Sequence, residues 1–162
     1  MYDARVVANE VLKSAWSKGY DVTQIDIQKI CYFLSGHHLV EHGEPLISSA
    51  FEAWDYGPVQ RSLYNAFKKF EDQPITEFAT AFDPIRRTTK ELPPIQSNTA
   101  RETIERHLEK YLAIPSFELV EITHSDGTPW TMTRSTSKQS ANIGMRISNE
   151  MIASHFEGLS VA

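Results

Sequence analysis

The stretch TQIDIQKICYFLSGHHLVEHG, residues 23–43, decides the fold. Thr23 followed three residues later by Asp26 is typical of a capped helix start, and a Gly-Glu-Pro sequence ends the pattern. One face of the predicted helix gathers Ile27, Ile30, Cys31, Leu34 and His38. This helix is predicted to be largely buried.

Further helices are predicted on both sides of this one. Residues 4–18 carry apolar residues at helical spacing, with Asp3 as the cap and Gly19 as the stop. The pair Gly57-Pro58 is predicted to start a helix that reaches Phe70, since proline at the first helical position loses no bonded donor. The same start signals predict helices from Asn98 to about Ala113, from Ser116, from Pro129, and from Ser148 to Gly158.

The remaining segments are short or irregular. Residues 50–54 and 145–147 are predicted as short strands, and residues 134–141 as a solvated loop. Residues 71–97 are predicted to form a long irregular connection with one short helical turn near residues 78–82. The expected fold is therefore mainly α: residues 1–162 form one compact single-domain helical bundle with a minor short β-strand pair.

Composition excludes several classes of function. The net charge is -5, and basic residues are scattered, with only short pairs such as Lys68-Lys69 and Arg86-Arg87. We predict that these pairs and Lys90 are solvated surface rather than a nucleic-acid site. The seven glycines are dispersed, so no phosphate-binding loop and no nucleotide cofactor is expected. One cysteine, no apolar run long enough for a membrane span and no signal-peptide pattern lead us to expect a cytoplasmic protein.

Three segments, in this order, resemble the Panacea domain family. They are IQKICYF at residues 27–33, FEAWDYGPV at residues 51–59, and LVEITH at residues 119–124 leading to Pro129-Trp130. The second is the most specific, because aromatic, glycine and proline residues in fixed order are not produced by amphipathic patterning alone. The polar insert at residues 125–128 departs from the family pattern, as does the connection around residues 83–96.

The resemblance implies a function as well as a fold. The family consists of helical, SocA-like antitoxins and phage-associated proteins, which neutralise partner toxins by direct contact. At least one type of member also acts as an adaptor that delivers a toxin to a protease. The resemblance therefore implies a non-enzymatic protein whose partner is a cognate toxin encoded nearby, with a protease complex as an alternative second partner.

The candidate binding residues lie in the second and third segments. Aromatic side chains at a surface are typical interface anchors, although a tryptophan in such a block also serves often as core. We expect Ala53 and Val59 to be core and the aromatic side chains to line one edge where a partner docks. The candidate partner-binding residues are Trp54, Tyr56, Gly57, Pro58, His124 and Trp130.

Two histidine patterns suggest chemistry, and neither completes a site. His124 with Ser125 and Asp126 resembles part of a hydrolase, but no nucleophile turn such as Gly-x-Ser-x-Gly accompanies it. The preferred interpretation is that His124 either hydrogen-bonds the backbone or packs on the indole. His38 and His42 have zinc-ligand spacing, but the intervening Leu-Val-Glu order differs from that of a metalloprotease helix and no third ligand is apparent. No catalytic residue, metal or cofactor is predicted.

Overall fold

The central helix α2, Gln24–His42, organises the molecule. Its start is the expected capping box, in which the Thr23 hydroxyl accepts from the backbone N–H of Asp26 and the Asp26 carboxylate accepts from that of Thr23. Its end is Gly43, in the left-handed conformation that glycine adopts without strain. Every residue from Ile27 to Gly36 is buried, so the prediction of a largely buried helix is confirmed.

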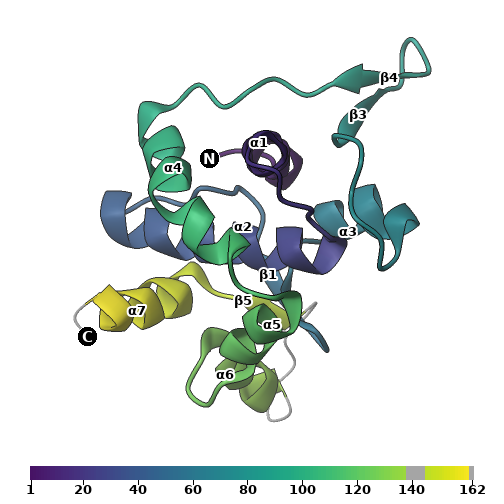
Figure 1. The fold of residues 1–162 in the computed structure, drawn as a ribbon. Helices are drawn as coiled ribbons and strands as arrows, with labels where there is room; N and C mark the ends of the chain where they lie inside the picture. The colour runs from purple at the N-terminus through teal and green to yellow at the C-terminus, as the bar shows by residue number, and fades with distance from the viewer. Residues whose placement is uncertain (138–144, 161–162) are drawn as a thin grey trace.

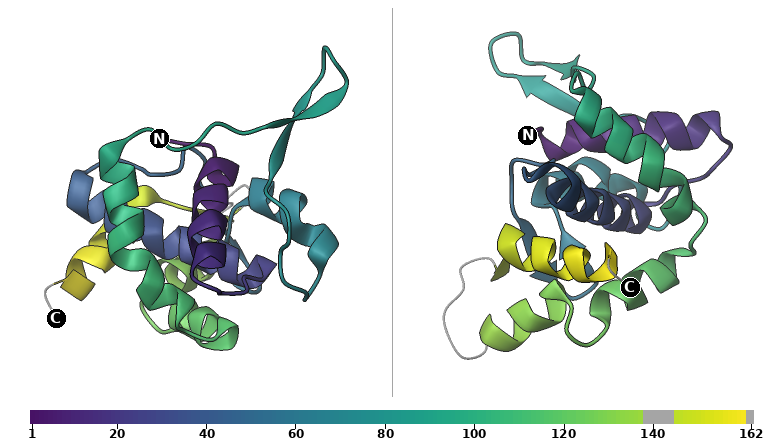
Figure 2. Two further views of the ribbon diagram at one scale, coloured as in Figure 1. Left: turned by 45° about the horizontal axis from the view of Figure 1, so that its top comes forward. Right: turned by 90° about the vertical axis from the view of Figure 1, so that its left-hand side faces the viewer.

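The computed structural model describes residues 1–137 and 145–160. In it, α1 (Ala4–Ser17), α4 (Asn98–Leu112) and α7 (Asn149–Ser160) pack around α2 (Figures 1 and 2). Asp3 caps α1 as expected, whereas the cap of α4 is Ser97 instead of Asn98. None of the described helices is long and apolar enough to cross a membrane.

A small antiparallel sheet lies against one end of α2. It is formed by β1 (Phe51–Trp54), β2 (Gly57–Val59) and β5 (Arg146–Ile147) in the order β2-β1-β5. The prediction that Gly57-Pro58 starts a helix is wrong, because Gly57 has a φ of +103° and closes a hairpin with Trp54. Pro58 lacks an N–H and is accommodated in the edge strand. The next helix, α3, runs from Arg61 to Phe67, and a 3₁₀ turn covers Lys68–Phe70.

The connection at residues 71–97 contains a second antiparallel pair. Strands β3 (Thr80–Asp83) and β4 (Thr88–Glu91) form a hairpin that projects from the helices, where the sequence predicted irregular chain and a helical turn near residues 78–82 (Figure 1). The mainly α class is confirmed, but the strands form a three-stranded sheet and a separate hairpin rather than one pair. All of β4 is exposed, so no half-buried alternation marks it in the sequence.

Two short helices lie beside the small sheet. They are α5 (Ser116–His124) and α6 (Pro129–Ser137), the second with proline first as predicted. The loop predicted from residue 134 is wrong as far as Ser137, and residues 138–144 lie outside the described residues. The predicted end at Gly158 is wrong, because this glycine does not take the left-handed conformation that ends a helix and α7 continues to Ser160.

The core surrounds α2 on several sides. Phe156 of α7 packs on Gly36, where the absence of a side chain leaves room for the aromatic ring. Tyr32 makes edge contacts with both Phe51 and Phe156, which joins the sheet to the last helix. Ala53 and Val59 are buried, as predicted.

Candidate protein-binding site

The β1–β2 hairpin presents its turn residues Asp55 and Tyr56 to solvent. Cα pairing of Trp54 with Gly57 leaves these two residues as the turn, and Tyr56 is 71% exposed. Neither Asp55 nor Tyr56 has a positive φ, so the turn is of neither the I′ nor the II′ type, and the one residue of the hairpin with a positive φ is Gly57, which follows it. The aromatic ring of Tyr56 is therefore held at the tip of a short, defined hairpin.

A buried lysine lies beneath this hairpin. Lys29, from the middle of α2, is 1% exposed, and its Nζ donates to the backbone carbonyl of Pro58 at 3.1 Å. A Cβ on Gly57 would lie 2.8 Å from Cε of Lys29 and 2.7 Å from Oγ1 of Thr123, so only glycine fits between α2 and α5. The lysine thus fixes the edge strand to the central helix.

Burial changes the ionisation of this lysine. Removal of its ammonium group from water lowers the pKa of Lys29 from 10.5 to about 7. The one hydrogen bond from Nζ goes to a neutral carbonyl, and no carboxylate among the described residues pairs with it. A buried amine of this kind costs folding free energy that a methionine of similar length does not.

We expect Lys29→Met to raise the free energy of unfolding by about 1–2 kcal/mol at pH 7, after allowing for the lost hydrogen bond to Pro58. Between pH 7 and about 10.5 the unfolded chain holds a proton on Lys29 that the folded chain has released, so this lysine makes stability rise with pH in that window. The advantage of the variant over the wild type should therefore shrink as pH rises from 7 to 10. Urea unfolding at several pH values measures it, and a constant difference would show that Lys29 titrates as it does in water.

Helix α6 holds the hairpin from the other side. Nε1 of Trp130 donates to the backbone carbonyl of Trp54 at 2.7 Å. The guanidinium of Arg134 donates to the carbonyl of Ala53 at 3.1 Å and to Oδ1 of Asp55 at 3.0 Å. The same guanidinium lies 5.1 Å from the centre of the Trp130 ring, a cation–π distance. Three backbone or turn positions of the hairpin are thus fixed by one short helix.

His124 stacks on Trp130, which is the second of the two alternatives that the sequence left open. The ring centroids are 3.8 Å apart and the rings are nearly parallel, at 6°. Burial, followed by the positive charges of Lys29 and Arg134, lowers the pKa of His124, so the ring is neutral at pH 7. Within the described residues its ring has no hydrogen bond to Ser125 or Asp126, and its buried Nε2 has no partner. The arrangement is that of a packing group and does not assemble a hydrolase site.

Trp54 lies half-buried on the outer face of the hairpin. Its Nε1 donates to Oε2 of Glu52 at 2.6 Å, and the guanidinium of Arg61 lies 5.4 Å from its ring centre while pairing with the same carboxylate. Tyr64 of α3 contacts the ring edge, with centroids 5.1 Å apart. Trp54 therefore has a cationic and an aromatic neighbour on the outer face of the hairpin.

The structure brings all six sequence-predicted residues together in space. Tyr56 is exposed, Trp54, His124 and Trp130 are half-buried, and Gly57 and Pro58 are buried parts of the hairpin. Sequence reasoning missed the residues that hold the hairpin in place. Of these, Lys29 carried a detectable signal, because a lysine flanked by apolar residues in a buried helix needs a specific partner. The residues missed are Lys29, Glu52, Arg61, Thr123 and Arg134.

Comparison with known proteins adds a family to this geometry. The family model described as "Antitoxin SocA-like, Panacea domain" matches residues 27–131. Antitoxin SocA of Caulobacter vibrioides (strain NA1000 / CB15N) is 30% identical over 154 residues, which cover 95% of this chain and 82% of that protein. The chain belongs to the SocA-like antitoxin family with a Panacea domain. No solved structure shows significant similarity to it.

The SocA-like Panacea segment encloses the site. It contains Lys29, the β1–β2 hairpin, His124 and Trp130, whereas Arg134 lies just beyond its end. The family assignment thus coincides with the part of the fold that builds and supports the exposed hairpin turn.

In this SocA-like chain, polar side chains near the end of α2 contact α4. His38 is buried, with Nδ1 at 3.0 Å from the Thr103 hydroxyl, and Nε2 of His37 lies 2.7 Å from the Tyr111 hydroxyl, so these two histidines of α2 contact α4. Glu41 of α2 also binds His107 of α4 at 2.6 Å, whereas Nε2 of His42 has no hydrogen-bond partner among the described residues. Among the described residues, no group of three His, Cys, Asp or Glu side chains is arranged to hold a metal. These contacts link the two helices.

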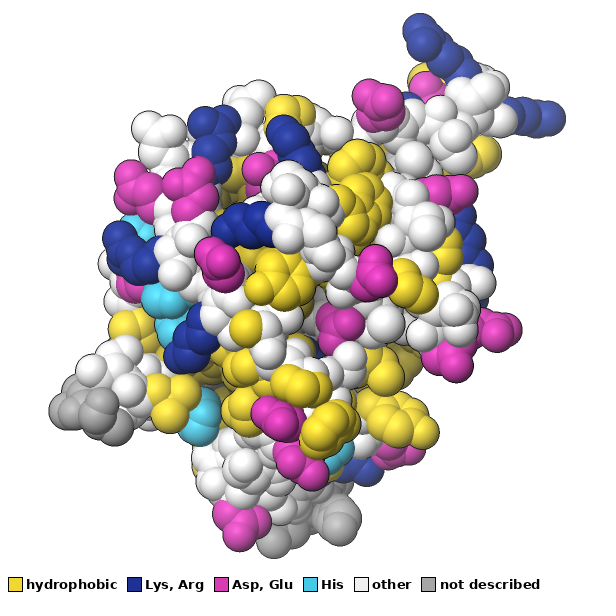
Figure 3. Space-filling view, viewed as in Figure 1, with side chains coloured by type: hydrophobic (Ala, Val, Ile, Leu, Met, Phe, Trp, Pro, Cys, Tyr) yellow, Lys and Arg dark blue, Asp and Glu magenta, His cyan; other side chains and the backbone are white. Residues whose placement is uncertain are grey.

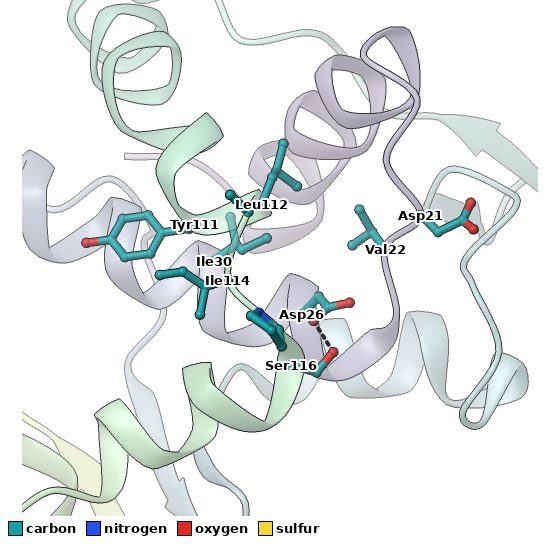
Figure 4. A pocket seen from close by; sticks show the side chains of 10 residues that line it. Asp21, Val22, Asp26, Ile30, Tyr111, Leu112, Ile114 and Ser116 are labelled. Carbon is teal, nitrogen blue, oxygen red and sulfur yellow. Dashed lines mark hydrogen bonds between the residues drawn. The ribbon is translucent and has the colours of Figure 1, made fainter.

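A cavity of about 260 Å³ lies where the loop from α4 to α5 passes the start of α2 (Figure 4). Of the two acids that line it, Asp26 is engaged on both carboxylate oxygens, with Ser116 bound to one at 2.5 Å and Thr23 to the other at 2.9 Å. The capping box of α2 therefore uses Asp26, which leaves Asp21 as the second acid of the lining.

Proposed function

We propose that this SocA-like protein neutralises a toxin by binding it directly, without catalysis, with the whole chain acting as one domain. The observation that carries the proposal is Tyr56, 71% exposed on a hairpin that Lys29, Trp130 and Arg134 hold in position. Aromatic residues on rigid supports lose little conformational entropy on binding, which makes them efficient anchors.

The proposed interface extends from the turn to its neighbours. Trp54, two residues before Tyr56, lies under the guanidinium of Arg61, and Trp130, stacked on His124, donates to the carbonyl of Trp54. Occlusion of the toxin's active surface by this interface accounts for neutralisation without any chemistry in the antitoxin. A single, buried cysteine, Cys31, suits formation of the complex in the reducing cytoplasm.

We expect Tyr56→Ala to weaken the complex about tenfold or more, with little effect on folding, because an exposed side chain makes few internal contacts. The test co-expresses the chain with the product of each adjacent reading frame that arrests growth, and scores growth rescue, co-purification and affinity. Leu159→Ala on α7 is the matched control, since that side chain is 53% exposed and belongs to another element.

Two results would count against this proposal. A folded Tyr56→Ala protein that binds and rescues like the wild type removes the hairpin from the interface. Measuring toxin abundance separates occlusion from delivery to a protease, since occlusion leaves the amount of toxin unchanged, whereas an adaptor lowers it.

A further inference from the structure

The β3–β4 hairpin stands apart from the helices (Figures 1 and 2). Its base is fixed to α1, where Asn9 exchanges two hydrogen bonds with the backbone of Ala79 and Arg5 donates to the carbonyl of Thr80. Beyond the base, Phe82 is 64% and Ile85 is 93% exposed. A two-stranded hairpin that buries so little surface is marginally stable by itself. Its exposed apolar tip is suited to contact with another molecule.

The hairpin also concentrates cations that the fold does not use. Within residues 1–137 and 145–160, the side chains of Arg86, Arg87 and Lys90 make no hydrogen bond, ion pair or ring contact, and Lys13 of α1 is the one other lysine or arginine of which this is true. Figure 3 shows basic side chains at the projecting tip. The hairpin also carries two acids, Asp83, whose Oδ1 accepts from the backbone N–H groups of Ile85 and Arg86, and Glu91 at its base, so the excess of positive charge lies at the tip. Because the chain as a whole has a net charge of -5, this small basic tip suits a short acidic segment better than an extended nucleic acid.

Strand β4 has an open edge. Its residues Thr88–Glu91 are all exposed, and among the described residues their backbone groups make no hydrogen bond outside the ladder with β3. Free N–H and C=O groups along a strand edge pair readily with an extended segment of another chain. The outer edge of β3 is less available for pairing, because Arg5 already donates a hydrogen bond to the carbonyl of Thr80.

A hollow of about 490 Å³ lies between α1 and the base of the hairpin. Lys13 lines it on the α1 side, but Glu10, Glu77 and Glu91 line it as well, so the hollow offers apolar contact and the cationic surface is confined to the tip of the hairpin. Figure 3 shows apolar side chains gathered between α1 and the hairpin. The apolar residues that line the hollow are Val6, Phe78, Ala79, Leu92, Pro93 and Pro94.

We propose that the β3–β4 hairpin is a second docking surface, which binds an extended acidic segment of a protein partner along the free edge of β4. Backbone hydrogen bonds of the added strand supply affinity, and its carboxylates pair with Arg86, Arg87 and Lys90. An apolar side chain of the segment enters the hollow beside Lys13. The inference rests on the proposed function in taking the occupant to be a protein, and it concerns a surface separate from the Tyr56 turn.

The test uses the full chain and two capped synthetic peptides, one of alternating glutamate and valine and one of alternating lysine and valine. We expect the acidic peptide to bind and to slow hydrogen exchange of the amides in Thr88–Glu91, and the basic peptide to do neither. The double variant Arg86→Glu with Arg87→Glu should bind the acidic peptide about tenfold more weakly or worse. Lys18→Glu with Lys110→Glu, two exposed cations elsewhere with the same change of net charge, should bind like the wild type.

Three outcomes would overturn the inference. They are equal binding of both peptides, equal loss in both double variants, and protection of the β4 amides by short duplex DNA but not by the acidic peptide. The peptide assay needs no toxin, and Tyr56→Ala should leave peptide binding unchanged. A failure of this inference can therefore be told apart from a failure of the proposed function.

Discussion

Gly57→Ala is expected to lower the free energy of unfolding by about 2–5 kcal/mol, since two costs coincide at this residue. A φ of +103° is strained for any residue with a Cβ, and the added carbon would lie 2.7 Å from Oγ1 of Thr123 and 2.8 Å from Cε of Lys29. Relief requires the edge strand to move away from α2, which breaks the hydrogen bond from Lys29 to Pro58. Urea or thermal unfolding measures the loss.

Gly127→Ala is the matched control for this substitution. Gly127 also has a positive φ, of +76°, but a Cβ there would meet nothing within 4 Å. It should therefore cost about 1–2 kcal/mol, from backbone conformation alone. Equal losses at the two glycines would show that the close approach beneath the hairpin contributes nothing to stability.

The second large effect is expected for Gly36→Ala, which should lower the free energy of unfolding by about 2–4 kcal/mol. A Cβ on this residue of α2 would lie 2.4 Å from two ring carbons of Phe156, and both residues are buried among rigid neighbours. The ring must leave its position, and α7 must shift with it. Calorimetry measures the loss, and near-ultraviolet circular dichroism reports the altered aromatic packing.

A double-mutant cycle tests the cause of that loss. Phe156→Leu removes the ring that Gly36→Ala would strike, so the two changes combined should cost less than the sum of their separate effects. Gly158→Ala on the same helix α7 meets nothing within 4 Å and should be neutral or stabilising by about 0.5–1 kcal/mol. Strict additivity of the first two changes would contradict the packing explanation.

The sequence predicted the helices where local signals were sufficient. The capping box of Thr23 and Asp26 and the apolar residues between Ile27 and Leu34 specify α2 without reference to the rest of the chain. The start assigned to Gly57-Pro58 failed because the same residues also suit an edge strand that follows a tight turn. What decides between the two is the contact of the hairpin with Trp130 and Arg134, separated in sequence by 76 residues or more.

The candidate site was predictable in part for the same reason. The aromatic residues Trp54, Tyr56 and Trp130 lie in blocks whose composition alone marks them. The role of Lys29 depends on where the chain places Pro58 and Thr123, which no local pattern specifies. The β3–β4 hairpin was missed because it buries too little to impose a period of two on its sequence.

The contacts that hold the Tyr56 turn have a consequence for protein synthesis. Trp130 and Arg134 bind the hairpin from 76 and 81 residues further along the chain, and β5 completes its sheet later still. At ordinary translation rates these partners leave the ribosome roughly 4–16 s after the hairpin itself. The nascent chain therefore exposes the Tyr56 turn for this interval before the side chains that hold it have been made, so the turn reaches its fixed position only after α6 has left the ribosome.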